Sequence, residues 1–338
     1  MAGKKITARD IADRLGVSIS TVGRAMADDP RISAATKRAV REVANEIGYV
    51  GNRAARMMRG ERSNLIGLVV PDIENDFYTS IAQTLSKCCE RQGYQIVLSV
   101  TNDDPDCELQ HLRDLVETKA AGIILVPSGS PRRECRDVLA NTPHVQLLRH
   151  VPLLGDAWFG IDDEAALHEA TAYLIGQGHR RIAYIGEADC HSTGSAHARG
   201  VRRACAEAGI DPADLRCLLG SPAMAFAEEA VTTLLAQGNP PTALLAGSVH
   251  HTLGMLKALI ARRAAIPRAF SLIGFGDPLW FAWWGDGLTT ISPPLETLAR
   301  TCGLWFIDQL NAEPGGFSPA RIQVNQSRLI LRGSVAGP

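Results

Sequence analysis

The chain has 338 residues, of which 46% are hydrophobic, so it is long and apolar enough to bury more than one core. Its net charge of −1 by itself excludes no class of partner, but the charge is unevenly distributed. Residues 1–63 contain 13 Lys/Arg and 7 Asp/Glu, a balance of +6, whereas the remainder contains 22 and 29, a balance of −7. A basic N-terminal segment on an acidic remainder is typical of a polyanion-binding module joined to a unit of another kind, although a chance fluctuation gives the same numbers.

The sequence also argues against a membrane segment, a metal site and a cofactor. The start, MAGKKITARDIADRL, has no apolar signal segment, and no run approaches the roughly 18 apolar residues of a membrane span. We therefore expect a cytoplasmic protein without a membrane partner, whose eight cysteines are free thiols. Cys190–His191 and His250–His251 lack a second pair at ligand spacing, so we predict neither a metal nor a cofactor.

Residues 6–47 have the pattern of three short helices. Thr7 followed by Asp10 resembles a capping box, Gly16 ends the first helix, Ser18 can cap the second, and Ser33 opens the third. The spacing of Ala12, Gly16 and Val22 is that of a helix-turn-helix. This motif needs a small residue where two helices cross, a glycine at the turn, and an apolar residue that fixes the second helix.

The second of these helices lies in VSISTVGRAM, residues 17–26, and we expect Val22, Ala25 and Met26 to pack inward. A helix held in this motif projects its first residues at the depth of a DNA major groove. We therefore predict that bases are contacted by Ile19, Ser20 and Arg24, and phosphates by the hydroxyls of Ser18, Thr21 and Ser33. The alternative is a structural three-helix unit with a solvated polar face.

From residue 65 the pattern changes to α/β. Continuous apolar runs alternate with amphipathic stretches at 79–92, 108–119, 164–177 and 196–208, which indicates parallel sheets covered on both faces. The runs are LIGLVVP, QIVLSVT, GIILVP, HVQLLRH, RIAYIG, TALLAG and FSLIGFG. Their number favours two doubly wound domains over one, with a ligand bound in a cleft beyond the carboxyl ends of the strands.

The sequence resembles the lactose-repressor/galactose-repressor (LacI/GalR) family of bacterial transcription regulators almost from end to end. The resemblance is carried, in order, by ITARDIADRLGVSISTVGRAM, GYVGNRAARMMRG, LIGLVVPDIENDFY, GHRRIAYIG, PPTALLAG, SLIGFGD and LTTI. It implies an all-α helix-turn-helix head, a hinge helix and a core of two periplasmic-binding-protein-like (type I) subdomains. The implied domains are 1–49 (head), 50–63 (hinge and linker), 64–162 with 292–322, and 163–291 with 323–338, so the chain crosses between subdomains near residues 162, 291 and 322.

The family's hinge helix falls on residues 52–59, where one apolar side chain of each subunit is implied to wedge into the minor groove. The matching residue is Met58, where leucine is usual. Gly23 and Gly51 also depart from the family's serine and proline, which raises the entropic cost of ordering this region. The remaining expected DNA contacts are Thr7, Arg31, Asn52, Arg53 and Arg56.

By the same resemblance, the effector cleft is lined by Phe77, Tyr78, Leu148, Arg149, Asp163, His191, Thr193, His197, Ser248, Val249, Gly276, Asp277 and Trp280. Sugar-binding relatives have carboxylates, amides and an arginine at several of these positions, where this chain has Leu148, Gly276, Ser248–Val249 and His197. A polyol needs converging donors and acceptors, which leucine, valine and glycine do not supply. We therefore expect a small organic or aromatic acid, held by Arg149 and the histidines against an apolar wall.

Tryptophans in DPLWFAWWGDG, residues 277–287, are expected either to stack on the ligand at the cleft mouth or to form an interface between subdomains or subunits. The resemblance further implies a homodimer that reads a near-palindromic operator in double-stranded DNA and is controlled by a small-molecule effector. Whether the effector releases the DNA or acts as a corepressor stays open.

Two other classes of function are alternatives to this one. The first is a cytosolic solute-binding or sensor protein whose head contacts a protein. The second is an enzyme, which the sequence disfavours because it has no GxSxG, Walker loop, HExxH or dinucleotide-binding glycine motif; no catalytic residue is predicted.

Overall fold

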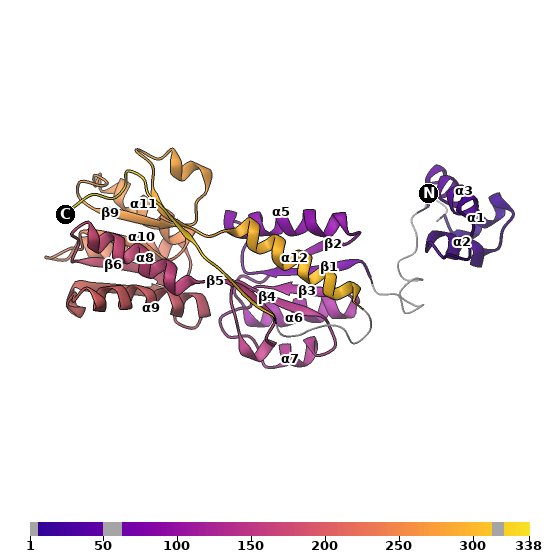
Figure 1. The fold of residues 1–338 in the computed structure, drawn as a ribbon, viewed down its shortest axis with the longest axis horizontal. Coiled ribbons are helices and arrows are strands. Elements are labelled where there is room, and N and C mark those ends of the chain that lie inside the picture. The colour runs from indigo at the N-terminus through magenta and orange to yellow at the C-terminus, as the bar shows by residue number, and fades with distance from the viewer. Residues whose placement is uncertain (1–5, 50–62, 313–320) are drawn as a thin grey trace, which may run out of the picture. The chain divides into compact units, whose positions relative to one another are not determined.

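The structure is a computed structural model that describes residues 6–49, 63–312 and 321–338 (Figure 1). The chain divides into two compact units, residues 1–62 and 63–338, which are described separately below. The predicted hinge residues Asn52, Arg53, Arg56 and Met58 lie outside the described residues.

Within residues 6–49, the first unit contains three helices, α1 (Ala8–Leu15), α2 (Ile19–Met26) and α3 (Ala34–Glu46), as predicted. Their small core is formed by Ile11, Ala12, Val22, Ala25, Val40 and Ala44, none of which is more than 3% exposed. Met26, predicted to pack inward, is instead 40% exposed, because it is the last residue of α2 and lies beyond the face that Val22 and Ala25 bury.

The predicted capping residues fix where these helices begin and end. The Asp10 carboxylate accepts hydrogen bonds from the Thr7 backbone N–H at 2.7 Å and from the Thr7 hydroxyl at 2.8 Å. Gly16 follows α1 with a φ of 65°, the left-handed conformation that glycine adopts without steric cost. Ser18 Oγ then accepts from the Thr21 N–H at 3.0 Å and caps α2. Gly16 and Ser18 therefore set the two ends of the turn between α1 and α2.

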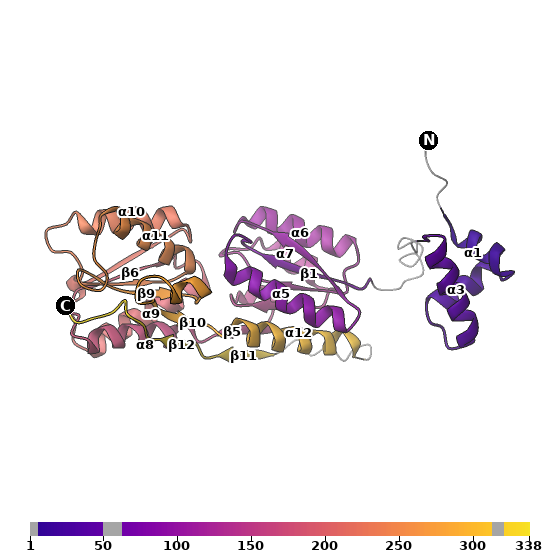
Figure 2. The ribbon, with the colours of Figure 1, turned by 90° about the horizontal axis from the view of Figure 1, so that it is seen from above.

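The second unit contains two six-stranded sheets of equivalent strand order (Figures 1 and 2). The first sheet has the order β2-β1-β3-β4-β5-β11, and all its pairings are parallel. Its strands are β1 (Leu65–Val70), β2 (Gln95–Val100), β3 (Gly122–Leu125), β4 (His144–Leu147), β5 (Trp158–Ile161) and β11 (Ile322–Asn325). Helices α5 (Asp76–Arg91) and α12 (Leu295–Asn311) cover one face, and α6 (Pro105–Glu117) and α7 (Glu134–Leu139) cover the other.

The second sheet has the order β7-β6-β8-β9-β10-β12 and is parallel except for β12, which runs antiparallel to β10. Its strands are β6 (Ile182–Glu187), β7 (Leu215–Gly220), β8 (Ala243–Ala246), β9 (Ser271–Phe275), β10 (Thr289–Ser292) and β12 (Arg328–Ile330). Helices α8 (Asp163–Gly176) and α9 (Ser192–Glu207) cover one face, and α10 (Met224–Leu235) and α11 (Val249–Ala261) cover the other.

The continuous apolar runs form these strands because both faces of each sheet are buried. In β1, Ile66 and Leu68 enter the cluster under α5 and α12, whereas Val69 enters the one under α6. All three side chains are fully buried. This arrangement is the one expected for parallel sheets covered on both faces.

The chain passes between the subdomains after β5, after β10 and after β11, so each subdomain contains segments far apart in sequence (Figure 2). The third passage lies between Asn325 and Arg328 and not near residue 322 as expected, because residues 322–325 pair in parallel with residues 158–161 of the first sheet. Across the described residues, no helix is long and apolar enough to span a membrane.

Candidate functional site

The head presents the predicted base-reading side chains to solvent. Ile19 is 47% exposed, and Ser20 and Arg24 are also exposed, while Val22 and Ala25 of the same helix are buried. Ser18 is occupied as the cap of α2, and Ser33 caps α3 by accepting from the Thr36 N–H at 3.2 Å. Both hydroxyls therefore lie at helix N-termini, where phosphate groups bind favourably.

Several basic side chains of the head are paired with acids. Arg31 contacts Asp29 at 2.7 Å, and this hydrogen-bonded arginine lowers the pKa of the Asp29 carboxyl. Lys37 and Arg41 contact Asp28 at 3.1 and 3.2 Å. In contrast, Arg24 makes no ion pair with any residue that the structure describes. Its guanidinium is therefore available to a partner outside this unit.

A second candidate site lies in the second unit, where the carboxyl ends of the two sets of parallel strands meet. Its residues follow β1, β4, β5, β6, β8 and β9, the edge at which doubly wound sheets bind ligands. About 460 Å³ of the cleft is not filled by protein atoms, a volume that includes space open to solvent. It is lined by Asn75, Phe77, Tyr78, Leu148, Arg149, Ile161, Asp163, Glu187, Thr193, His197, Gly247, Ser248, Val249 and Phe275.

Nine of the residues predicted for the cleft are therefore brought together, and four are not. His191 is 7% exposed and lies behind the cleft wall, against Asp103 and Glu187. Gly276 and Asp277 line a different depression beside residues 292–297, where Asp277 pairs with Arg332 at 2.8 Å.

The fourth exception, Trp280, packs edge-on against Phe281 with ring centroids 4.4 Å apart. Phe281 is fully buried in the core under α10 and α11, and Trp280 and Trp284 are partly buried against that core. The tryptophan-rich segment therefore belongs to the second subdomain's own core rather than to the cleft. Among the tryptophans that the structure describes in this segment, Trp283 is the one mainly exposed, at 71%, and the neighbouring Leu279 is 70% exposed.

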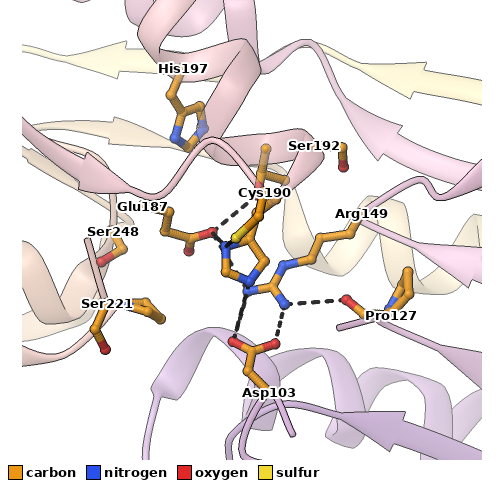
Figure 3. Close-up of polar contacts among 12 residues, drawn as sticks. Asp103, Pro127, Arg149, Glu187, Cys190, Ser192, His197, Ser221 and Ser248 are labelled. Carbon is orange, nitrogen blue, oxygen red and sulfur yellow. Dashed lines mark hydrogen bonds and ion pairs between the residues drawn. The ribbon is translucent and has the colours of Figure 1, made fainter. Parts of the chain in front are cut away.

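Sequence reasoning missed the acids that surround Arg149. Arg149 is 3% exposed and hydrogen-bonds both carboxylate oxygens of Asp103 and the carbonyl oxygen of Pro127 (Figure 3). It also lies 3.6 Å from Glu187 of the opposite subdomain. The available signal was position, since Asp103 follows β2 and Glu187 ends β6 at the ligand-binding edge.

Electrostatics in the cleft follow from these contacts. Burial alone would raise the pKa of Glu187, but Arg149 and the nearby histidines outweigh burial and lower that pKa, so the carboxylate is ionised. Burial, followed by repulsion from Arg149, lowers the pKa of His191. Arg149 thus already has two carboxylates beside it, those of Asp103 and Glu187.

A further polar pair joins α8 and α9 at the cleft. His197 Nε2 lies 3.0 Å from Asp163 Oδ1, and the two side chains are 3% and 8% exposed. The His197 ring also packs against Phe275 with centroids 5.1 Å apart, which fixes its orientation. The cleft therefore combines an aromatic and aliphatic wall with charged groups that are already paired. Among the described residues, no group of His, Cys, Asp and Glu could hold a metal ion.

Comparisons with known proteins agree with this architecture. Residues 7–52 match the family described as bacterial regulatory proteins, lacI family, and residues 171–335 match the periplasmic binding protein-like domain. The chain is 30% identical over 308 residues to the HTH-type transcriptional regulator DegA of Bacillus subtilis (strain 168), covering 88% of this chain and 91% of that relative. It is 26% identical over 333 residues to the HTH-type transcriptional regulator GalR of Escherichia coli (strain K12), covering 98% and 96%.

The fold matches a crystal structure of the lac repressor dimer bound to operator and the anti-inducer ONPF, with a TM-score of 0.84 and 20% identity. That match covers 98% of this chain and 100% of the other. A helix-turn-helix head on a core of two periplasmic-binding-protein-like subdomains defines a DNA-binding transcriptional regulator. The chain belongs to the lacI family of bacterial regulatory proteins, as the sequence predicted. These relatives are transcription regulators and not enzymes, which confirms the prediction that the chain is not an enzyme.

Proposed function

We propose that this regulator is a repressor that binds a specific operator and is controlled by a small molecule in the core cleft. The observation that carries the proposal is the exposure of Ile19, Ser20 and Arg24 on a helix whose other face is buried. Such a helix can enter a major groove, where arginine pairs with guanine and an apolar side chain contacts a thymine methyl. We propose that the protein acts as a homodimer in the bacterial cytoplasm, because two heads read a near-palindromic site symmetrically.

The domain division at residues 49 and 63, and the roles of Asn52, Arg53, Arg56 and Met58 in the minor groove, stay predictions that rest on the family resemblance. Replacing Met58 by glycine tests the proposed insertion of this side chain into the minor groove. Specific binding should weaken while ligand binding is retained, and a duplex bent equally by the variant would contradict the role.

Selection of bound sequences from random DNA tests the function. We expect a near-palindromic consensus, and an affinity that falls steeply between 50 and 200 mM salt because several phosphate contacts release counterions. A flat salt dependence without sequence preference would favour the sensor protein whose head contacts another protein.

For the effector, we propose a small organic or aromatic acid. Leu148, Val249 and Phe275 supply an apolar wall, and Arg149 and His197 supply cationic or hydrogen-bonding groups. Because Asp103 and Glu187 already contact Arg149, an incoming carboxylate must take the place of one of them. The proposal therefore requires an exchange of ion pairs and not the occupation of a free arginine.

Thermal-shift measurements with matched pairs of an acid and its neutral analogue test this class. Suitable pairs are benzoate with benzyl alcohol and gluconate with glucose. A saturable increase in melting temperature should come from the acids, since ligand bound only to the native state stabilises it. If a neutral sugar gave the only saturable shift, the acid proposal would be wrong.

A further inference from the structure

We propose that Asp103, Arg149, Glu187 and His191 form a latch that holds the two core subdomains together, and that releasing the latch changes the affinity for DNA. The inference rests on the proposed function, since it assigns a regulatory role to one edge of the effector cleft. The four residues, named the cross-cleft cluster here, come from both subdomains. Figure 3 shows three of them, Asp103, Arg149 and Glu187.

Two contacts of the cluster join one subdomain to the other. Asp103 and Arg149 follow strands of the first sheet, whereas Glu187 and His191 lie at the end of β6 and before α9 in the second subdomain. Arg149 Nη2 lies 3.6 Å from Glu187, and His191 Nε2 lies 3.8 Å from Asp103. Within each subdomain, Arg149 hydrogen-bonds Asp103, and His191 Nδ1 lies 3.7 Å from Glu187. The four side chains thus close a ring across the cleft.

Burial makes these contacts energetically significant. The side chains of Arg149 and Glu187 are 3% and 11% exposed, so water screens their charges weakly, and the His191 side chain is 9% exposed. Removing Glu187 or Asp103 takes away one of the two carboxylates beside the buried Arg149, so its charge is only partly compensated and the arrangement that buries it is disfavoured. Opening the cleft would restore water to that charge. Loss of a partner is therefore expected to shift the subdomains toward a more open arrangement.

In the first subdomain, hydrogen bonds fix the position of Ser128, next to the residue that packs against His191. The buried Glu108 accepts hydrogen bonds from the Ser128 N–H at 2.6 Å and from its hydroxyl at 3.2 Å. The next residue, Gly129, packs so closely that an added Cβ would lie 2.9 Å from the His191 ring. Beside this contact, the His150 N–H donates to Ser192 Oγ across the cleft at 3.0 Å. Two further contacts therefore cross the cleft beside the cluster, Gly129 against His191 and His150 with Ser192.

Arg149 and Glu187 also line the effector cleft, so a ligand that hydrogen-bonds either residue competes with their mutual contact. This position couples occupation of the cleft to the contact between subdomains. A ligand changes an equilibrium only by its differential affinity for the two states, and competition at the latch supplies that difference.

The test compares Glu187→Gln with Glu164→Gln in the full-length protein. Glutamine keeps the shape of Glu187 but removes its charge. Glu164 is a matched control, because it pairs with Arg199 and Arg203 at 3.0 and 2.6 Å within the second subdomain. Hydrogen–deuterium exchange is measured in peptides covering residues 127–130 and 187–193, and operator affinity is measured by fluorescence anisotropy on the selected DNA. Circular dichroism checks that each variant is folded.

We expect Glu187→Gln to accelerate exchange in both peptides and to change the dissociation constant for DNA about 5-fold or more, while Glu164→Gln changes neither. Asp103→Asn, made in the first subdomain, should accelerate exchange in residues 187–193 of the opposite one, which a purely local role would not. Equal exchange in Glu187→Gln and Glu164→Gln would overturn the latch, and faster exchange with unchanged DNA affinity would overturn its regulatory role. Failure of the wild type to bind DNA would refute the proposed function instead, and the exchange comparison would still decide the latch.

Discussion

At the scale of single residues, Arg24 is a position in the head where base recognition can be distinguished from a purely electrostatic contact with phosphate. The side chain is exposed on α2 and is not paired with any described acid, unlike Arg31, which is held by Asp29. A guanidinium can form two parallel hydrogen bonds to the edge of a guanine, whereas the ammonium of lysine cannot reproduce this fork. A role in base reading and a role in phosphate contact therefore predict different results for two substitutions.

Arg24→Ala should weaken binding to the selected operator by about 1–3 kcal/mol and relax the preference at one base pair. Arg24→Lys should keep most of the affinity for random DNA, because the charge remains, while losing the same base preference. Anisotropy titrations of both variants on operator and on scrambled DNA measure the two effects. Equal losses on both DNAs for Arg24→Ala would show that the side chain contacts only phosphate.

The residues of the cleft could be predicted only in part. Phe77 and Tyr78 lie in the first turn of α5 after β1, and Ser248 caps α11 after β8, so collinear motifs could place them at the cleft that they line. The pairing of Arg149 with Asp103 joins residues 46 positions apart through a loop in which Asn102 and Asp103 both have positive φ. No local pattern specifies such a contact, because it depends on how two loops approach in space.

At the scale of elements, the helix-turn-helix contains two glycines with opposite backbone requirements. Gly16 adopts a φ of 65° after α1, whereas Gly23 lies within α2, and an added Cβ would meet no atom within 4 Å at either position. Side-chain packing is therefore not a factor in replacing either residue. What differs is the backbone conformation that alanine must adopt.

Gly16→Ala should destabilise the head by about 1–2 kcal/mol, the cost of a left-handed conformation for a residue with a Cβ. Gly23→Ala should stabilise it by up to about 1 kcal/mol, because alanine loses less entropy in a helix. Hydrogen exchange of residues 8–46 in the full-length protein measures both changes. Destabilisation by Gly23→Ala would contradict the assignment of residue 23 to an unstrained helix.

The elements best predicted from sequence are those buried on both sides. Seven apolar runs correspond to β1, β2, β3, β4, β6, β8 and β9. The runs did not include β5, β7, β10, β11 and β12. Of these, β7, β11 and β12 form sheet edges and are partly exposed, whereas β5 and β10 are buried strands of only four residues. The runs include one edge strand, β2. An edge strand buries fewer side chains, so its sequence is less constrained, and the third passage between subdomains was consequently predicted near residue 322, at the start of β11 and not after it.

At the scale of the whole molecule, the two sheets of equivalent topology line the same cleft from opposite sides. The strand order places the carboxyl ends of β1 and β6 at facing edges, so each subdomain contributes one wall of the cleft. The aromatic contact between Phe77 and Phe275, with centroids 6.3 Å apart, joins the two walls. Relative movement of the subdomains therefore changes every contact that spans the cleft, which is what an allosteric regulator requires.

Buried neutral histidines make the stability of this core dependent on pH. His251 is fully buried; its Nε2 lies 2.9 Å from the Ser221 carbonyl oxygen, and its Nδ1 has no partner within the described part of the chain. Burial lowers the pKa of His251, as it does for His191. In the unfolded chain both groups take up protons near pH 6.5, whereas the native state resists protonation. Because the unfolded state binds more protons as pH falls, stability is present above about pH 6.5 and is lost below it.

We therefore expect a lower melting temperature at pH 5.5 than at pH 7.5, with up to about 1.4 kcal/mol lost per pH unit for each histidine. His251→Gln should reduce this loss, because the amide can still donate to Ser221 but cannot titrate. His168→Gln is the matched control, since His168 is partly exposed and contacts Glu207 at 2.7 Å. Thermal unfolding of the three proteins at both pH values measures the difference. A loss as large in His251→Gln as in the wild type would mean that other groups, and not this buried imidazole, govern the acid sensitivity of the core.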